Sequence, residues 1–153
     1  MTSSPDRRHT ASRHIKTSPQ AIYDAFLNRD ALSKWLPPQG ATGDIDVFEP
    51  RVGGRFRMTL TFESAPGKSS KNTDVVDGQF VDLVPGKRIV QAFEFVSDDP
   101  AFAGTMTMNW KLEAVSGGTS VTVVADDVPS GISRADHEVG MNSTLANLAA
   151  FVE

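Results

Sequence analysis

Cysteine is absent from the 153-residue sequence. Its absence excludes disulfide bonds, thiolate metal sites and cysteine catalysis, and it fits a cytoplasmic protein. No apolar run reaches the ~20 residues that a membrane-spanning helix needs, and the polar segment 1–9 has no apolar stretch like that of a signal peptide. Positive charge is also limited, since the formal net charge is −4. We therefore expect no membrane span and no nucleic-acid partner, because phosphate binding needs a basic surface.

Histidine is scarce: the sequence has His9, His14 and His137, and no two of them have the spacing of metal ligands. No serine, histidine and acid arrangement has local support. Gly53-Gly54 is not a phosphate-binding loop, because it precedes a predicted strand and not a helix. It predicts a tight turn or bulge with positive φ. We therefore predict no catalytic residue, no metal site and no cofactor.

One long stretch, residues 130–152, has helical rather than strand periodicity. Its apolar residues recur at steps of four, three and four, at Met141, Leu145, Leu148 and Val152. This spacing places them on one face of a helix. A single amphipathic helix that follows a run of strands must bury its apolar face against a sheet.

His137 lies one turn before Met141 on the apolar face of this helix. Ser130 or Ser133 is expected to be the N-cap, because a side-chain oxygen there can accept a hydrogen bond from the first turn. The opposite face is polar and carries Asn142, Ser143, Asn147 and Glu153.

The chain is expected to form a single domain over residues 10–153, preceded by a disordered tail over residues 1–9. A short first strand is expected at 10–16. Ser18 and Pro19 then predict the start of a helix, with Ser18 as N-cap and proline at the first helical position. Asp30 is expected to cap a second short helix, which ends before the prolines of residues 37–38.

Alternating polar and apolar residues predict six further strands, at 44–49, 55–62, 74–84, 88–96, 104–113 and 119–125. The phase of the strand at 74–84 is ambiguous, because Phe80 and the pair Val81 and Leu83 fall on opposite faces. Residues 63–73 are expected to form a mobile hairpin loop. Short turns between consecutive strands favour an antiparallel meander. We expect the first strand to pair with the last and so to close the sheet around the terminal helix.

The inward faces of these strands are rich in aromatic residues and methionine. Two interpretations stay open: a packed core, which composition favours, or the lining of a cavity, for which adaptable methionine side chains are suited. His137, Gln91 and Tyr23 are the polar candidates for such a cavity.

Several motifs, in this order and spacing, carry a family resemblance: SPQAIYDAF at 18–26, LSKWLPP at 32–38, FEPRVGGRFRM at 48–58, VPGKRIV at 84–90, GTSVT at 118–122 and HEVGM at 137–141. From about residue 12 to the C-terminus the chain resembles the activator of heat shock protein 90 ATPase homologue family of the START-like (SRPBCC) superfamily, which includes the birch pollen allergen. The resemblance implies an α+β helix-grip fold: a seven-stranded antiparallel sheet wrapped around a long C-terminal helix, with two short helices between the first two strands.

The resemblance also favours the cavity over the packed core, because relatives hold lipids, polyketides or other apolar molecules there. Family members often have tryptophan where this chain has Met141, which implies a reshaped cavity mouth. The chaperone activity behind the family name is not carried over to this chain.

We therefore expect a noncatalytic protein that binds an apolar or amphipathic small molecule. The expected lining consists of Phe56, Met58, Phe93, Phe95, Met106, Met108, Trp110, His137 and Met141. One alternative is a polyketide cyclase- or hydrolase-like enzyme with His137 as general base or Tyr23 as donor, which needs two or more polar groups converging in the cavity. Another is a module that interacts with a chaperone or other protein, which expects an exposed apolar patch and no cavity. Homodimer formation stays open.

Overall fold

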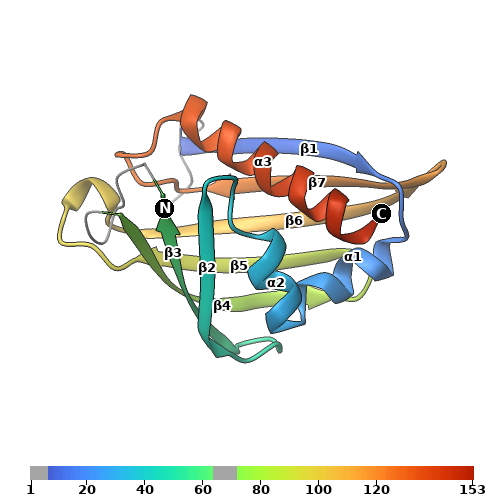
Figure 1. Ribbon diagram of the computed structural model, residues 1–153, viewed down its shortest axis with the longest axis horizontal. Coiled ribbons are helices and arrows are strands. Elements are labelled where there is room, and N and C mark those ends of the chain that lie inside the picture. The colour runs from blue at the N-terminus through green and yellow to red at the C-terminus, as the bar shows by residue number, and fades with distance from the viewer. Residues whose placement is uncertain (1–6, 64–71) are drawn as a thin grey trace.

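Two short helices connect the first two strands in the computed structural model, which describes residues 7–63 and 72–153 (Figure 1). α1 (Pro19–Phe26) begins after Ser18, whose hydroxyl oxygen accepts a hydrogen bond from the Ala21 backbone N–H at 3.2 Å. This confirms the predicted cap.

The cap of the second helix, α2 (Arg29–Trp35), differs from the prediction. Asn28 is the N-cap, and its side-chain oxygen accepts from the Ala31 backbone N–H at 2.9 Å. Asp30 lies inside the first turn, where its negative charge is favourable near the positive end of the helix dipole. Asparagine and aspartate are equally good caps, so sequence alone did not separate the two positions.

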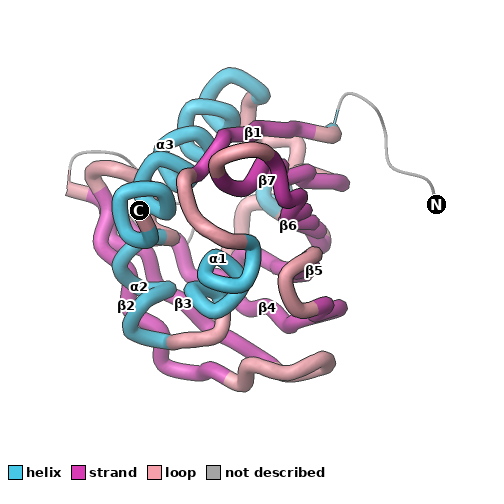
Figure 2. Tube along the Cα trace, turned by 90° about the vertical axis from the view of Figure 1, so that its right-hand side faces the viewer, coloured by secondary structure: helices cyan, strands magenta, loops and turns pink. Residues whose placement is uncertain are grey.

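The seven strands form one antiparallel sheet in the order β1-β7-β6-β5-β4-β3-β2. The strands are β1 (His9–Ile15), β2 (Ala41–Phe48), β3 (Arg55–Phe62), β4 (Thr73–Val84), β5 (Arg88–Phe95), β6 (Thr105–Val115) and β7 (Gly118–Asp126). The predicted pairing of the first strand with the last is confirmed. The sheet nevertheless stays open, because β1 and β2 lie at its opposite edges. Figure 2 shows the sheet curving around the helices, which lie on one side of it.

A β-bulge explains the ambiguous phase of β4. The register of β4 against β5 shifts between Phe80 and Asp82. Phe80 is fully buried, whereas Val81 is 47 % exposed. An extra residue reverses the facing of every later side chain, which a strict alternation pattern cannot describe. Most of the loop predicted at 63–73 lies outside the described residues.

α3 (Arg134–Val152) crosses the concave face of the sheet (Figure 1). Ser133, and not Ser130, is its N-cap, and its hydroxyl oxygen accepts from the Asp136 backbone N–H at 3.1 Å. Met141 and Leu145 are buried, as the periodicity predicted.

Polar side chains in the middle of α3 make long-range hydrogen bonds that the sequence did not indicate. Thr144 donates its hydroxyl proton to the Leu36 carbonyl at 3.0 Å, and Asn147 donates to the Pro37 carbonyl at 2.9 Å. The Ser143 hydroxyl oxygen accepts from the Gln39 backbone N–H at 2.9 Å. These three bonds join the middle of α3 to the segment between α2 and β2.

The chain is ordered upstream of the predicted start of the domain. His9 belongs to β1 and is fully buried, and Arg7 donates hydrogen bonds to the carbonyls of Val128 and Ile132 at 2.8 and 2.6 Å. The prediction of a tail therefore fails for residues 7–9, because a long-range contact with the segment before α3 holds them. Residues 1–6 lie outside the described part of the chain.

An aromatic cluster joins α1, α2 and the sheet. The ring centroids of Phe26 and Trp35 are 4.7 Å apart, and those of Phe26 and Trp110 are 5.1 Å apart, both in edge-to-face geometry. Trp110 donates its indole N–H to the Gln91 side-chain oxygen at 3.0 Å. Gln91 therefore lies among inward aromatic residues as a hydrogen-bond partner of the core.

The pKa of the Tyr23 phenol leads to a prediction about how stability depends on pH. Burial raises the pKa of its phenol above the ordinary value of 10.0, and the carboxylates of Asp24 and Asp82 raise it further. A raised pKa in the folded state means that this contribution to stability is complete below pH ~10 and is lost as the pH rises through the raised pKa. We expect Tyr23→Phe to lose less stability than the wild type when urea unfolding is compared between pH 9 and pH ~11.

Tyr23 is the sole tyrosine of the sequence, so the phenolate absorbance of the native protein reports on it alone. A native titration midpoint at or below that of the urea-unfolded protein would contradict the prediction. Unfolding at pH ~8, where the phenol is protonated in both states, serves as the control.

Candidate functional site: a cavity between the sheet and the C-terminal helix

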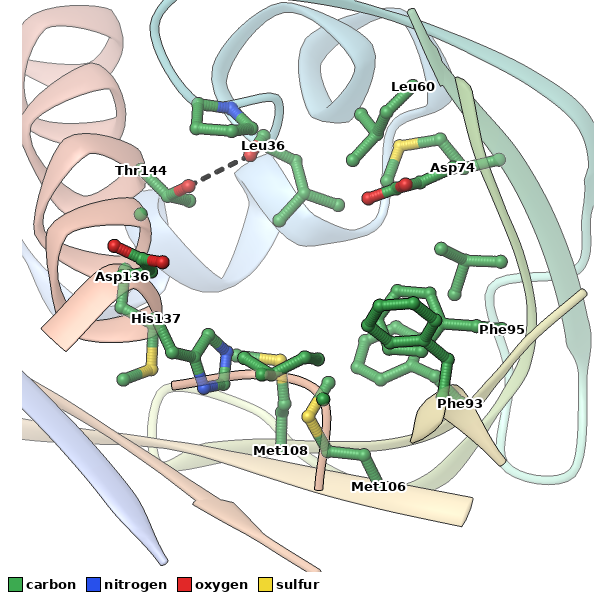
Figure 3. A pocket seen from close by; sticks show the side chains of 18 of the residues that line it. Leu36, Leu60, Asp74, Phe93, Phe95, Met106, Met108, Asp136, His137 and Thr144 are labelled. Atoms are coloured by element: carbon green, nitrogen blue, oxygen red, sulfur yellow. Dashed lines mark hydrogen bonds between the residues drawn. The ribbon is translucent and has the colours of Figure 1, made fainter. Parts of the chain in front are cut away.

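A cavity of about 660 Å³ lies between the sheet and the first half of α3. Its walls come from β3, β4, β5 and β6, from the segment after α2, from η2 (Pro100–Phe102) and from the segment that leads into α3. Figure 3 shows side chains of α3 on one side and side chains of the strands on the other.

Eight of the nine residues predicted to line a cavity do so: Met58, Phe93, Phe95, Met106, Met108, Trp110, His137 and Met141. Phe56 does not line it. Its ring packs against Phe80 and Phe93 with centroids 5.4 and 5.3 Å away, and it is 1 % exposed. Each of the two interpretations therefore holds for one part of the sheet. The inward face is a packed core at Phe56 and borders the cavity at Met58. Tyr23 and Gln91 are not among the lining residues.

Several lining residues were not predicted. The apolar ones are Leu36, Pro38, Leu60, Phe62, Val76, Phe102, Gly131, Ile132 and Gly140, and the polar ones are Asp74, Ser133, Asp136 and Thr144. The sequence contains an indication that Asp74 points inward, because it lies at the same alternate positions of the strand as the inward residues Val76 and Phe80. No local pattern indicated Leu36, Pro38 or Phe102, because they come from turns and loops that tertiary contacts bring to the cavity.

Methionine is frequent in the cavity wall. Four of the five methionines of the sequence, Met58, Met106, Met108 and Met141, line the cavity. Met106 pairs with Phe93 across β5 and β6, so a thioether and an aromatic ring lie side by side. Unbranched methionine side chains can adjust to ligands of different shape.

His137 projects from α3 into the cavity (Figure 3). Its Nδ1 lies 2.9 Å from Nδ1 of His9, and the ring centroids are 5.1 Å apart. One of these nitrogens must carry a proton and the other must accept it, so a doubly protonated pair would lose this bond. The contact ties the start of α3 to β1 and holds the His137 ring in place.

Two carboxyl groups also line the cavity, on opposite walls (Figure 3). Asp74 on β4 is 2 % exposed, whereas Asp136 is exposed in the first turn of α3. Thr144 contributes an oxygen that is already bonded to the Leu36 carbonyl. The cavity is thus mainly apolar, with a few polar groups that can orient a ligand.

Neither a group of metal ligands nor a membrane-spanning helix is found within residues 7–63 and 72–153. That part of the chain contains no cluster of three or more side chains arranged to hold a metal ion. None of its helices combines the length and hydropathy that crossing a membrane requires.

A curved seven-stranded antiparallel sheet around a long C-terminal helix, with two short helices between its first two strands, defines a helix-grip protein. The chain belongs to the family described as activator of Hsp90 ATPase homolog 1-like protein, whose model matches residues 16–153. The predicted fold and the predicted family are both confirmed.

Solved structures of bacterial proteins share this fold over nearly the whole chain. A protein of Chromobacterium violaceum is 30 % identical, with a TM-score of 0.86 over 96 % of this chain and 97 % of that one. A Rhodobacter sphaeroides protein is 21 % identical, with a TM-score of 0.75 over 97 % and 95 % of the two chains. A Staphylococcus epidermidis protein is 19 % identical, with a TM-score of 0.76 over 99 % and 93 %. No curated protein matches the sequence.

Proposed function

We propose that this protein binds an apolar or amphipathic small molecule in the cavity between the sheet and α3, without transforming it. The observation that carries the proposal is the cavity itself, about 660 Å³ in volume and lined mainly by aromatic and methionine side chains. Ligand sites in proteins commonly enclose about 300–1,000 Å³ and have this kind of apolar wall with few polar groups.

Burial differs between the two ends of the cavity. Met108 and Trp110 are buried, whereas Leu60, Phe95 and Phe102 are only partly buried. The partly buried residues come from β3 and β5, near their ends, and from η2, and we place the mouth of the cavity beside them. An apolar tail would therefore enter beside these residues and reach toward Trp110.

A series of ligands that differ in chain length tests the proposal. Burial of apolar surface contributes roughly 25 cal/mol per Å², or about 0.8 kcal/mol per methylene group. Affinity measured by calorimetry should therefore rise with chain length until the cavity is full. Native mass spectrometry before and after denaturation would show whether the purified protein carries a molecule already. An affinity that does not change with chain length would contradict the proposal.

Met141→Trp is a specific test of where the ligand lies. Met141 is 3 % exposed and lines the cavity. A larger ring at this position removes room for about two methylene groups, so affinity for the longest ligand should fall roughly tenfold while the shortest ligand is little affected. Val139→Trp is the control, because Val139 lies on the same helix, is 70 % exposed and does not line the cavity. Equal losses for all chain lengths would place the ligand elsewhere.

A second candidate function is a hydrolase- or cyclase-like enzyme that uses the same cavity. The observation that favours it is that Asp136 and His137 are adjacent residues of α3 and both line the cavity, because this chemistry needs polar groups that lie close together. His137 would act as general base while His9 holds its ring. Time courses with an ester substrate series would decide, since turnover that His137→Ala abolishes would favour the enzyme. The interaction module expected no cavity, so the cavity counts against it.

A further inference from the structure

Gly140 differs from every other glycine that the structure describes. Each of the others has either a positive φ or a site at which an added β-carbon would lie closer than 3.0 Å to another atom. Gly140 has a helical backbone, and a β-carbon there would meet no described atom within 4 Å. It is not a helix cap either, because it lies well inside α3 (Arg134–Val152). Backbone conformation, packing and capping therefore do not require glycine at this position.

Glycine inside a helix is unfavourable. Relative to alanine it lowers the equilibrium constant for helix formation roughly fivefold, because it gains more backbone freedom in the unfolded chain. Proteins commonly keep such a destabilising residue where a functional site needs it. One such need is the close approach of the backbone to a ligand, which the absence of a side chain allows.

The position of Gly140 on α3 agrees with this need. The residues of α3 that line the cavity are Asp136, His137, Gly140, Met141 and Thr144. Asp136 and Thr144 lie one helical turn before and one turn after Gly140, on the same side of the helix. Gly140 is therefore in the middle of the wall that α3 contributes, and the helix backbone is open to the cavity there.

Hydrogen bonds hold α3 in place on both sides of Gly140. On one side, Nδ1 of His137 lies 2.9 Å from Nδ1 of His9 on β1. On the other, the Thr144 hydroxyl donates to the Leu36 carbonyl at 3.0 Å. These bonds keep the helix from moving away from a wider ligand. The room at this wall therefore depends on the absence of a side chain at Gly140.

We propose that Gly140 determines the width of the ligand, and that a rigid apolar group broader than an alkyl chain lies against the α3 backbone at this position. This inference rests on the proposed function, because it names the class of ligand for the same cavity. A flexible chain can rotate its bonds to pass a side chain at position 140. A rigid ring system cannot, so it depends on the glycine.

Stability measurements test whether the position is open. Gly140→Ala should lower the equilibrium constant for unfolding roughly fivefold and so raise the urea midpoint. Gly140→Leu should also raise it, because leucine favours the helix and its side chain fills apolar space. Val139→Ala is the matched control, since it raises the helix propensity at an exposed position of α3 that does not line the cavity. A urea midpoint of Gly140→Ala below that of the wild type would overturn the proposal.

Affinity measurements with two neutral alcohols test the width. 1-Pyrenemethanol carries a rigid fused-ring group and is titrated by its fluorescence, whereas 1-dodecanol carries a flexible chain and is titrated calorimetrically. Gly140→Leu should lower the affinity for 1-pyrenemethanol at least roughly tenfold and that for 1-dodecanol less than about threefold. Val139→Ala should leave both affinities within about twofold of the wild type. Should Gly140→Leu fail to fold, Gly140→Ala decides, with an expected loss of roughly threefold for 1-pyrenemethanol alone.

The outcomes separate this proposal from the binding function. Equal losses of both alcohols in Gly140→Leu, or no loss of either, would overturn the role of Gly140 in selecting width and leave the binding function intact. The same holds if the native protein binds 1-dodecanol but not 1-pyrenemethanol. Failure of both alcohols to bind the native protein would overturn the binding function itself, and the selection of width with it.

Discussion

Replacing Trp110 with alanine is expected to lower the free energy of unfolding by about 3–5 kcal/mol. Trp110 is 1 % exposed, packs edge-to-face on Phe26 and Trp35, and donates a hydrogen bond to Gln91. The variant removes these contacts and enlarges the cavity, which Trp110 lines. Since small domains are stable by only about 5–15 kcal/mol, urea denaturation followed by circular dichroism will measure the change easily.

The contribution of the hydrogen bond can be separated from that of packing. Trp110→Phe keeps an aromatic ring but leaves the Gln91 side-chain oxygen buried without its donor, which should cost about 1–3 kcal/mol. A Trp110→Phe, Gln91→Leu double variant should recover part of this loss, because neither polar group then remains buried. A loss below about 1 kcal/mol for Trp110→Ala would contradict the described packing.

Gly54→Ala is expected to lower the free energy of unfolding by about 3 kcal/mol or more. A β-carbon at this position would overlap the Glu49 carbonyl oxygen and would lie 2.8 Å from the Arg51 carbonyl oxygen. Both are backbone atoms, so no side-chain rotation relieves the clash. The Gly54 carbonyl also accepts a hydrogen bond from the Phe80 N–H at 2.9 Å, which couples the turn to the bulge in β4.

Gly53→Ala is the matched control for this prediction. Gly53 has φ +80°, but a β-carbon there would meet no atom within 4 Å. The cost is therefore conformational strain alone, about 1–2 kcal/mol. Thermal and urea unfolding should show that Gly54→Ala is much less stable than Gly53→Ala. Equal stability of the two would show that strain and not close approach governs the turn.

Structural features that depend on a few neighbouring residues were predicted well. The alternation of β3 matched its observed bounds, Arg55–Phe62, and Ser18 with Pro19 marked the start of α1. Local patterns failed where two local solutions were equivalent, as with Asn28 and Asp30. They also failed where a bulge broke the alternation, as at Phe80 in β4.

The candidate site was predicted through the same alternation. Inward positions on β5 and β6, such as Phe93 and Met106, followed from a period of two. Phe56 obeyed the same pattern and yet packs in the core, because alternation gives the side of the sheet and not the distance to the opposite layer. Alternation does not identify Asp74 as a lining residue, because its charge argues against an inward position and the phase of its strand is ambiguous.

The sequence by itself determined the element order, the inward and outward faces of most strands, the apolar face of α3 and the family. These depend on periodicity, capping and motif spacing, which act over a few residues. Only the tertiary structure decided that the inward face is filled at Phe56 and hollow beside Met58. That difference depends on which side chains the rest of the fold brings to each end, because Phe80 and Phe93 pack on Phe56, whereas residues of α3 border the cavity beside Met58. Bonds between residues more than 100 positions apart, Thr144 to Leu36 and Arg7 to Val128, hold α3 and the segment before it in place.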